Sequence, residues 1–239
     1  SATFSAAENQ TSVSTVSATD AEGGTLTYTL SGTDASSFSI NSSGVITFNS
    51  APDYETKSSY SITVGVTDGT NAVSQSVTVS VTNVNDVSPV IGSSSTFSAT
   101  ENQNTVGTVT ATDADSDSLT YSLSGTDASS FGINSSTGVI TFNSAPDYET
   151  KTSYAITVNV TDGTNAVSQS VTVSVTNVND NNPTITSASS FSAAENQTSV
   201  GTVTATDADG DGLTYSLSGT DSSSFSINSS TGAITFNSA

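Results

Sequence analysis

The sequence predicts an all-β protein made of tandem seven-stranded Greek-key β-sandwiches, and three observations support this fold class. The tripeptide Glu-Asn-Gln begins at residues 8, 101 and 195, a spacing far longer than that of solenoid repeats, so each unit is large enough to bury its own core. Within each unit apolar residues alternate with Ser and Thr at period two, which is typical of strands with one wet face. Turn signals rich in Gly, Asp and Ser separate these runs at the short intervals of an antiparallel sandwich.

The strands are expected in the same order in every unit. In the first unit they lie near residues 3–7, 11–19, 25–31, 37–41, 44–48, 59–67 and 72–83. The alternation is clear where Leu26, Tyr28 and Leu30 are separated by threonines. Asp34 lies in the Gly-Thr-Asp turn that follows this strand, and we expect it to be a turn former or a cap.

The two longest strands each place four apolar residues on one face. These are Tyr60, Ile62, Val64 and Val66 in one strand and Val73, Val77, Val79 and Val81 in the other. Because residues i and i+2 of a strand point to the same side, these side chains should form the centre of a core.

Self-comparison places the repeats at residues 1–90, 91–183 and 184–239. The third repeat contains no counterpart of the strands at 59–67 and 72–83. We therefore expect a truncated third sandwich with an exposed apolar edge. Truncation of a longer array is the simplest explanation, so we interpret the chain as a piece of a larger protein.

The composition excludes several classes of function. The chain has 22 acidic residues against two basic ones, Lys57 and Lys151, and a formal net charge of −20. Binding to nucleic acid or to anionic lipid is excluded because no basic patch can form. Cys and His are absent, which rules out zinc, haem and iron–sulfur sites of the usual kinds. Since no apolar run reaches the length of a membrane span, we expect no membrane insertion in this segment.

The acidic residues recur at the same few points of each repeat. In the second repeat they are Glu101, Asp113-Ala-Asp115, Asp147-Tyr-Glu149, Asp162 and Asn179-Asp180. A calcium ion takes six to eight oxygen ligands, and several carboxylates must converge to offset its dehydration. Acidic motifs in a constant order at domain joints therefore predict calcium sites between repeats.

These motifs resemble those of cadherin domains. The matching pieces are Ala-Glu-Asn, Asp-Ala-Asp, Asp-Tyr-Glu, Thr-Asp-Gly and Asn-x-Asn-Asp-Asn-x-Pro, and they imply an immunoglobulin-like sandwich with calcium ions in the linkers. For the first joint the resemblance implies ligands at Glu8, Asp53, Glu55, Asn83, Asn85, Asp86, Asp113, Asp115 and Asp162. For the second joint it implies Glu101, Asp147, Glu149, Asn177, Asn179, Asp180, Asn181, Asp207 and Asp209. Asp20, Glu22 and Asp68 would serve a joint with a preceding repeat.

The linkers depart from the family pattern at two positions. Asn83 and Asn177 stand where the family usually has Asp, which removes one charge from each joint. Val87 stands where the second linker has Asn181, and a valine side chain offers no oxygen. We therefore expect the first joint to bind fewer calcium ions than the second, or to bind them more weakly.

Two rival calcium interpretations are weaker. The run from Asp207 to Gly212 begins like an EF-hand loop, but the twelfth position is Ser218 instead of Glu. Glycine-rich nonapeptide repeats of the RTX type are absent.

Asp117 and Asp211 have no counterpart among the family's ligands, so we expect each to be a turn residue rather than an extra ligand.

The sequence thus predicts a calcium-rigidified extracellular repeat that forms the shaft of a cell-surface or secreted adhesin or filament. Its expected partners are neighbouring repeats of the same chain, with identical chains as further candidates in a filament or adhesive contact. Near-identical repeats favour a large microbial surface protein. Direct homophilic or glycan adhesion by the repeats stays open as the alternative. Glycosidase chemistry by Asp53 and Glu55 is disfavoured, because the same pair recurs at each joint.

Overall fold

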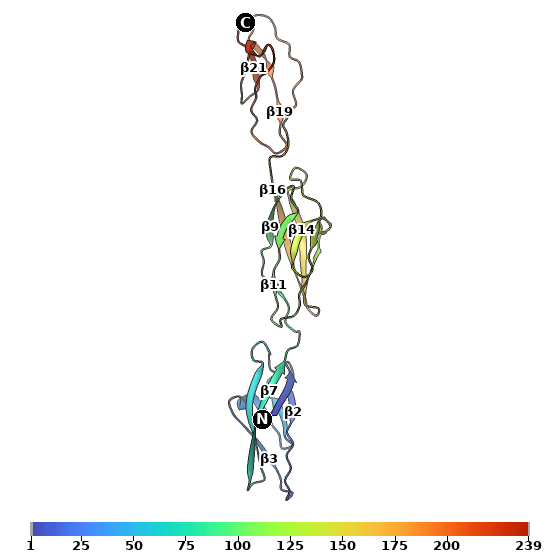
Figure 1. Ribbon diagram of the computed structural model, residues 1–239, viewed down its shortest axis with the longest axis vertical. Coiled ribbons are helices and arrows are strands. Elements are labelled where there is room, and N and C mark those ends of the chain that lie inside the picture. The colour runs from blue at the N-terminus through green and yellow to red at the C-terminus, as the bar shows by residue number, and fades with distance from the viewer. Residues whose placement is uncertain (1, 239) are drawn as a thin grey trace. The chain divides into compact units, whose positions relative to one another are not determined.

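The computed structural model describes residues 2–238 and shows an all-β chain (Figure 1). Contacts divide the chain into two compact units. The first consists of Ser1–Gly92, Thr110–Tyr121 and Asn159–Ser168, and the second of Ser93–Val109, Ser122–Val158 and Gln169–Ala239. Within the described residues, no helix is long and apolar enough to cross a membrane.

The first repeat forms two sheets that together contain seven strands. The four-stranded sheet has the order β1 (Ala2–Ala7), β7 (Ala72–Thr82), β6 (Ser59–Thr67) and β3 (Thr27–Ser31). The three-stranded sheet has the order β2 (Ser12–Thr15), β5 (Val45–Phe48) and β4 (Phe38–Ile40). These strands agree with the period-two pattern, although β2 is shorter than the predicted 11–19.

One pairing differs from the expected antiparallel arrangement. β1 pairs with β7 in parallel, with Ala7 opposite Thr82, and the backbone N–H of Glu8 donates to the carbonyl of Thr82 at 3.2 Å. Alternation of apolar and polar residues reports which face a side chain occupies and not which strand lies beside it. The parallel pairing has a direct consequence, because both strands end at the same end of the sandwich. Glu8 and the segment that follows Thr82 therefore leave the sheet side by side.

The core of the first repeat contains the predicted apolar positions of the long strands. Ile62, Val64, Val77 and Val79 are each at most 1% exposed. Val73 is the exception, since it is 68% exposed. It shares a face with the other valines of β7 but lies near the start of that strand, where the burial pattern of the strand shows exposed side chains.

The second repeat has the same sheets. The four-stranded sheet has the order β12 (Thr120–Ser124), β15 (Ser153–Thr161), β16 (Ala166–Thr176) and β9 (Thr96–Thr100), with β9 again parallel to β16. The three-stranded sheet has the order β10 (Thr105–Thr108), β14 (Val139–Phe142) and β13 (Phe131–Ile133). A further short pair joins β8 (Val90–Ile91) to β11 (Ala111–Thr112), just before the Asp-Ala-Asp motif.

The third repeat contains five short strands within the described residues. It contains β17 (Thr184–Ile185), β18 (Ser199–Thr202), β19 (Ala205–Thr206), β20 (Phe225–Ile227) and β21 (Ala233–Phe236). The segments that correspond to β9 and β12 are irregular here, because the strands with which they would pair are not in the sequence. Phe191 is consequently 39% exposed.

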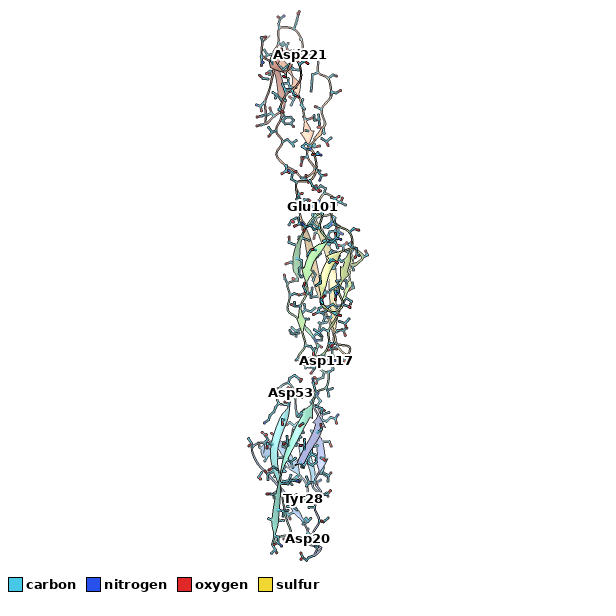
Figure 2. The ribbon with its side chains drawn as sticks, in the orientation of Figure 1. Asp20, Tyr28, Asp53, Glu101, Asp117 and Asp221 are labelled. Carbon is cyan, nitrogen blue, oxygen red and sulfur yellow. The ribbon has the colours of Figure 1, made fainter. Side chains whose placement is uncertain are left out.

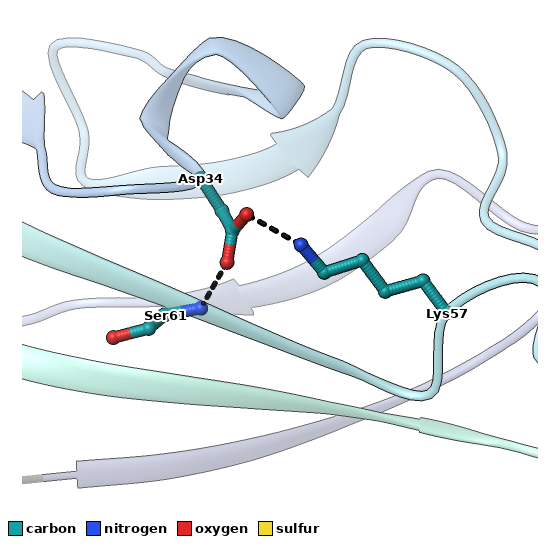
Figure 3. A network of polar contacts seen from close by, with 3 residues as sticks. All are labelled: Asp34, Lys57 and Ser61. Atoms are coloured by element: carbon teal, nitrogen blue, oxygen red, sulfur yellow. Dashed lines mark hydrogen bonds and ion pairs between the residues drawn. The ribbon is translucent and has the colours of Figure 1, made fainter.

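A short 3₁₀ turn in each repeat brings an aspartate to the end of the three-stranded sheet. These turns are η1 (Ala35–Ser37), η2 (Ala128–Ser130) and η3 (Ser222–Ser224). Asp34 precedes η1 but makes no side-chain cap. Its carboxylate instead accepts hydrogen bonds from the Lys57 ammonium at 2.5 Å and from the backbone N–H of Ser61 at 2.7 Å (Figure 3). Of the two roles expected for Asp34, turn former or cap, the side-chain cap is not present. The Asp34 side chain instead connects the turn to β6.

Lys57 is held from two sides. Its ammonium lies 4.6 Å from the centroid of the Tyr60 ring, in addition to its ion pair with Asp34. Lys151 makes the same two contacts with Tyr154 and Asp127 in the second repeat. Both basic side chains of the chain are thus engaged by acids other than those at the joints.

Replacing Asp34 by Ala should accelerate hydrogen exchange at the Ser61 amide more than replacing Lys57 by Ala. Only the first change removes the acceptor of that N–H, which then has no side-chain partner. Exchange followed by NMR measures this directly. The Ala155 amide, which donates to the unchanged Asp127 at 2.8 Å, is the matched control. Equal protection of Ser61 in both variants would contradict the assignment.

Candidate metal centres

Four carboxylates converge where the first repeat ends. We name Glu8, Glu55, Asp86 and Asp115 the first acidic cluster, and each has an oxygen within 4.8 Å of an oxygen of every other member. Glu8 follows β1, Glu55 lies in the turn before β6, Asp86 lies in the linker after β7, and Asp115 follows β11. All four belong to the first compact unit.

Glu8 is the most buried member of this cluster and is only 2% exposed. One of its carboxylate oxygens accepts the backbone N–H of Tyr54 at 2.8 Å, and the other accepts that of Val84 at 2.7 Å. Glu8 therefore ties the Asp-Tyr-Glu turn to the linker. Two backbone donors satisfy only part of a carboxylate's capacity, so lone pairs stay free for another ligand.

Asp115 is the second buried member, at 6% exposed. Its Oδ2 accepts the backbone N–H groups of Asp86 at 3.1 Å and Val87 at 2.8 Å. Its Oδ1 is buried and accepts no hydrogen bond from the described residues, and the same holds for Oδ2 of Asp113. A buried carboxylate oxygen without a donor is costly, because it has lost its hydration without replacement.

The second linker repeats this arrangement. Glu101, Glu149, Asp180 and Asp209 form the second acidic cluster, with the same 4.8 Å limit between oxygens, inside the second compact unit. Glu101 is 2% exposed, and its carboxylate accepts the backbone N–H groups of Tyr148 at 2.8 Å and Val178 at 2.6 Å. Asp209 accepts those of Asp180 and Asn181.

The donor set of each cluster fits a hard divalent cation. Both lysines are engaged by Asp34 and Asp127, so neither cluster has a protein cation to offset its charge. Every candidate ligand is a carboxylate or amide oxygen, which suits Ca²⁺ or Mg²⁺ and not a soft metal. Four carboxylates at such short range repel one another strongly unless a cation or protons neutralise them.

Comparison with known proteins identifies the family of these repeats. A family model for the cadherin domain matches residues 2–83 and again residues 95–177. The chain belongs to the cadherin family.

Relatives of these cadherin domains are long animal proteins. Mouse Protocadherin Fat 4 is 40% identical over 161 residues, which is 61% of this chain and 3% of that protein. Human Cadherin-23 is 34% identical over 161 residues, 63% of this chain and 5% of that protein. The chain thus spans a small part of the relatives that it matches. The crystal structure of mouse Cadherin-23 EC22-24 has a TM-score of 0.79 and 30% identity, and the match covers 99% of this chain and 85% of that one.

Several of the expected ligands of these cadherin domains make hydrogen bonds to the turns and linkers beside the clusters. Asp53 uses its carboxylate to accept the backbone N–H and the hydroxyl of Thr56, at 2.9 and 3.0 Å, and Asp147 does the same with Thr150. Asn83 and Asn177 donate their amides to the backbone carbonyls of Asp115 and Asp209, each at 2.8 Å. These residues brace the turns and linkers that carry the clustered carboxylates.

Asp162 and Asn85 meet in a separate network. Asn85 donates its amide to the Asp162 carbonyl at 3.3 Å and accepts the Asn165 amide at 3.0 Å. The Asp162 carboxylate accepts the backbone N–H groups of Thr164 and Asn165. The expected ligand Asn179 lies in the second linker, and Asp207 groups with Asp209 and Asp211.

Asn181 makes a contact that the sequence interpretation did not anticipate. Its amide nitrogen donates to carboxylate oxygens of Asp180 at 2.7 Å, Asp209 at 3.0 Å and Glu149 at 3.3 Å. The expectation was that Asn181 offers an oxygen that Val87 lacks. In the structure the Asn181 side chain also donates hydrogen bonds to three carboxylates of the second cluster, which Val87 cannot do for the first.

The acids at the far end of the first repeat do not form such a cluster. Asp20 accepts the backbone N–H groups of Glu22 at 3.0 Å and Gly24 at 2.8 Å, and Asp68 accepts those of Thr70 and Asn71. Among the described residues, these acids do not form a group like the first acidic cluster. Asp20 and Asp53 mark opposite ends of this sandwich (Figure 2).

Two asparagines near the clusters were missed from the sequence. Asn9 and Asn102 have positive φ angles of 60° and 61°, and their amides donate to Asp86 and Asp180. Their position directly after Glu in the Glu-Asn-Gln motif is a usable signal, because Asn tolerates this backbone conformation better than most residues. Asp117 and Asp211, expected to be turn residues, group with the Asp-Ala-Asp carboxylates.

The pKa values of carboxyl groups in the clusters are shifted in opposite directions by different causes. Desolvation, reinforced by Asp115 and Glu8, raises the pKa of Glu55. Desolvation, reinforced by Glu101 and Asp209, likewise raises the pKa of Glu149. The hydrogen bond from the Asn181 side chain is the main cause that lowers the pKa of Asp209.

These shifts predict a pH dependence in a metal-chelating buffer. A raised pKa means that the folded protein binds the proton more tightly than the unfolded chain, so stability from Glu55 and Glu149 falls as pH rises through the folded pKa. Lowering the pH from 7 toward 4.5, the ordinary value for Glu, should therefore raise the melting temperature. Calorimetry of the parent and of the E55Q/E149Q variant measures this. The variant should gain less, because only the raised pKa of Asp117, caused mainly by desolvation, remains among these groups. A variant that gains as much stability as the parent as the pH falls would contradict the assignment.

Proposed function

We propose that the two acidic clusters bind Ca²⁺ and that calcium stiffens the linkers of an extracellular cadherin-repeat array. The observation that carries this proposal is the unpartnered buried oxygen of Asp115, in a cluster of four carboxylates with no protein cation. The family match supports it, and so does the second cluster, which repeats the same contacts.

Calcium is the cation that suits these sites best. The ligands come from three or more separate segments and include long, adaptable Glu side chains, whereas Mg²⁺ demands a near-ideal octahedron and keeps several waters. Linker sites of extracellular modules work at about 10⁻⁴ to 10⁻³ M calcium, which places the functional setting outside the cell.

The proposed role of calcium is mechanical. Without the ion, repulsion between carboxylates drives the turns and the linker apart. With the ion, segments that carry Glu8, Glu55, Asp86 and Asp115 become ligands of a common centre. The proposed repeats are residues 1–90, 91–183 and 184–239, and neighbouring repeats of the same chain are the primary partners.

At the level of the whole protein, we propose a shaft for a surface adhesin or filament. Recurrence of the same carboxylate pairs at both linkers suits a structural ligand better than a catalyst. The near-identity of the repeats favours recent duplication, as in giant microbial surface proteins, although the relatives named above are from animals. A microbial origin therefore rests on repeat identity alone.

Small-angle X-ray scattering in excess calcium and in chelator tests the proposed stiffening. The parent chain should show a longer and narrower distance distribution in calcium, and D180A should show a smaller calcium effect. Asp180 lies in the linker and belongs to the second acidic cluster. Replacing it should therefore weaken calcium binding at the linker without destabilising a sandwich core.

The matched control is D221N, which also removes one negative charge from the chain. Asp221 is exposed and lies outside the four carboxylate groups identified in residues 2–238 (Figure 2). It should respond to calcium as the parent does. Scattering curves of the parent that are identical in calcium and chelator would overturn the proposed function.

A further inference from the structure

A three-carboxylate group adjoins each cluster, and its third member lies outside the ligand set that the family resemblance implies. Asp113, Asp115 and Asp117 have oxygens within 4.8 Å of one another, and Asp207, Asp209 and Asp211 repeat the arrangement. We call these groups the Asp117 triad and the Asp211 triad. Each lies on one loop inside one compact unit.

The loop geometry explains how the third carboxylate reaches the pair. Ser116 has a φ of 65° and Gly210 a φ of 80°, so the chain reverses just before Asp117 and Asp211. The backbone N–H of Asp117 then donates to Asp113 Oδ1 at 3.3 Å, and that of Asp211 donates to Asp207 Oδ1 at the same distance. This turn accounts for the backbone position but gives the third carboxylate no partner of opposite charge.

A second observation indicates a ligand at the Asp117 triad. Asp115 is more than nine-tenths buried, and its Oδ1 accepts no hydrogen bond from the described residues. Oδ2 of Asp113 is buried and equally without a donor. Two members of the triad thus each keep one oxygen that the protein leaves unsatisfied, beside a third carboxylate.

The first repeat provides an internal comparison. Gly24 stands at the place of Asp117, and its N–H donates to Asp20 Oδ2 at 2.8 Å while that of Glu22 donates to Oδ1. Both oxygens of Asp20 are therefore satisfied by the backbone. A Cβ at Gly24 would lie 2.5 Å from Asp20 Oδ2, so a side chain at this position would have to displace the Asp20 carboxylate. The loop with Gly24 therefore differs from the loops with Asp117 and Asp211. Of these three loops, all within the described residues, only the two with the third Asp bring three carboxylates within 4.8 Å of one another.

We propose that Asp117 is an additional ligand of the divalent cation held by Asp113 and Asp115 at the first linker. The proposal rests on the calcium function proposed above. An extra carboxylate raises the negative charge of the site, and charge count is a main determinant of calcium affinity. The first linker should accordingly bind calcium more tightly than the same linker with a neutral residue at this position.

Calorimetric titration of calcium into the 239-residue chain tests this, with the variants D117N and D221N, each of which loses one negative charge. D117N should weaken one class of sites on the order of tenfold, whereas D221N should titrate like the parent. If D117N titrates like D221N, the proposal is overturned.

Melting in chelator separates a ligand from a turn former. A ligand variant should melt at the same temperature as the parent or higher, because it relieves repulsion within the triad. A lower melting temperature in chelator with unchanged calcium affinity would make Asp117 a turn residue and overturn the proposal.

The variant D115N distinguishes this proposal from the function on which it rests. D115N should weaken calcium binding whether or not Asp117 is a ligand, because Asp115 belongs to the first acidic cluster in both cases. If D115N weakens binding and D117N does not, only the additional ligand is wrong. If neither changes the titration, the calcium site proposed at the first linker is itself wrong.

Discussion

Both linkers depend on one electrostatic constraint, the close approach of four carboxylates without a basic side chain between them. The chain has two lysines and no arginine, and each lysine is held by a different aspartate and an aromatic ring. Charge in the clusters therefore has to be balanced from outside the chain, by cations or by protons. This dependence is what would make the state of a linker respond to the calcium concentration of its surroundings.

The fold creates this constraint through the parallel pairing of first and last strands. Because β1 runs beside β7 in the same direction, Glu8 leaves the sheet next to the linker, where backbone N–H groups of Tyr54 and Val84 hold it. The short β8–β11 pair then positions the loop that carries Asp115. Among the described residues, the apolar sandwich cores carry none of the clustered carboxylates. Their role is to hold the strands whose ends carry these residues.

Much of this could be predicted from the sequence, and the failures have physical reasons. Period-two alternation located the strands, but it could not identify the parallel partner of β1, because alternation reports faces only. Motif position identified Glu8, Glu55, Asp86 and Asp115, yet it could not separate Glu55 from Asp53, whose carboxylate turns to Thr56. The close approach of Asp117 to Asp113 was not expected, because it depends on the reversed backbone at Ser116.

Anomalous X-ray diffraction from crystals grown in calcium tests the central claim most directly. Data collected at a long wavelength, where calcium scatters anomalously, locate the ions without reference to the protein model. The account predicts difference peaks at both acidic clusters, within about 2.3–2.6 Å of carboxylate oxygens that include those of Glu8 and Glu101. Peaks only at scattered surface acids, or none at either cluster at saturating calcium, would contradict it.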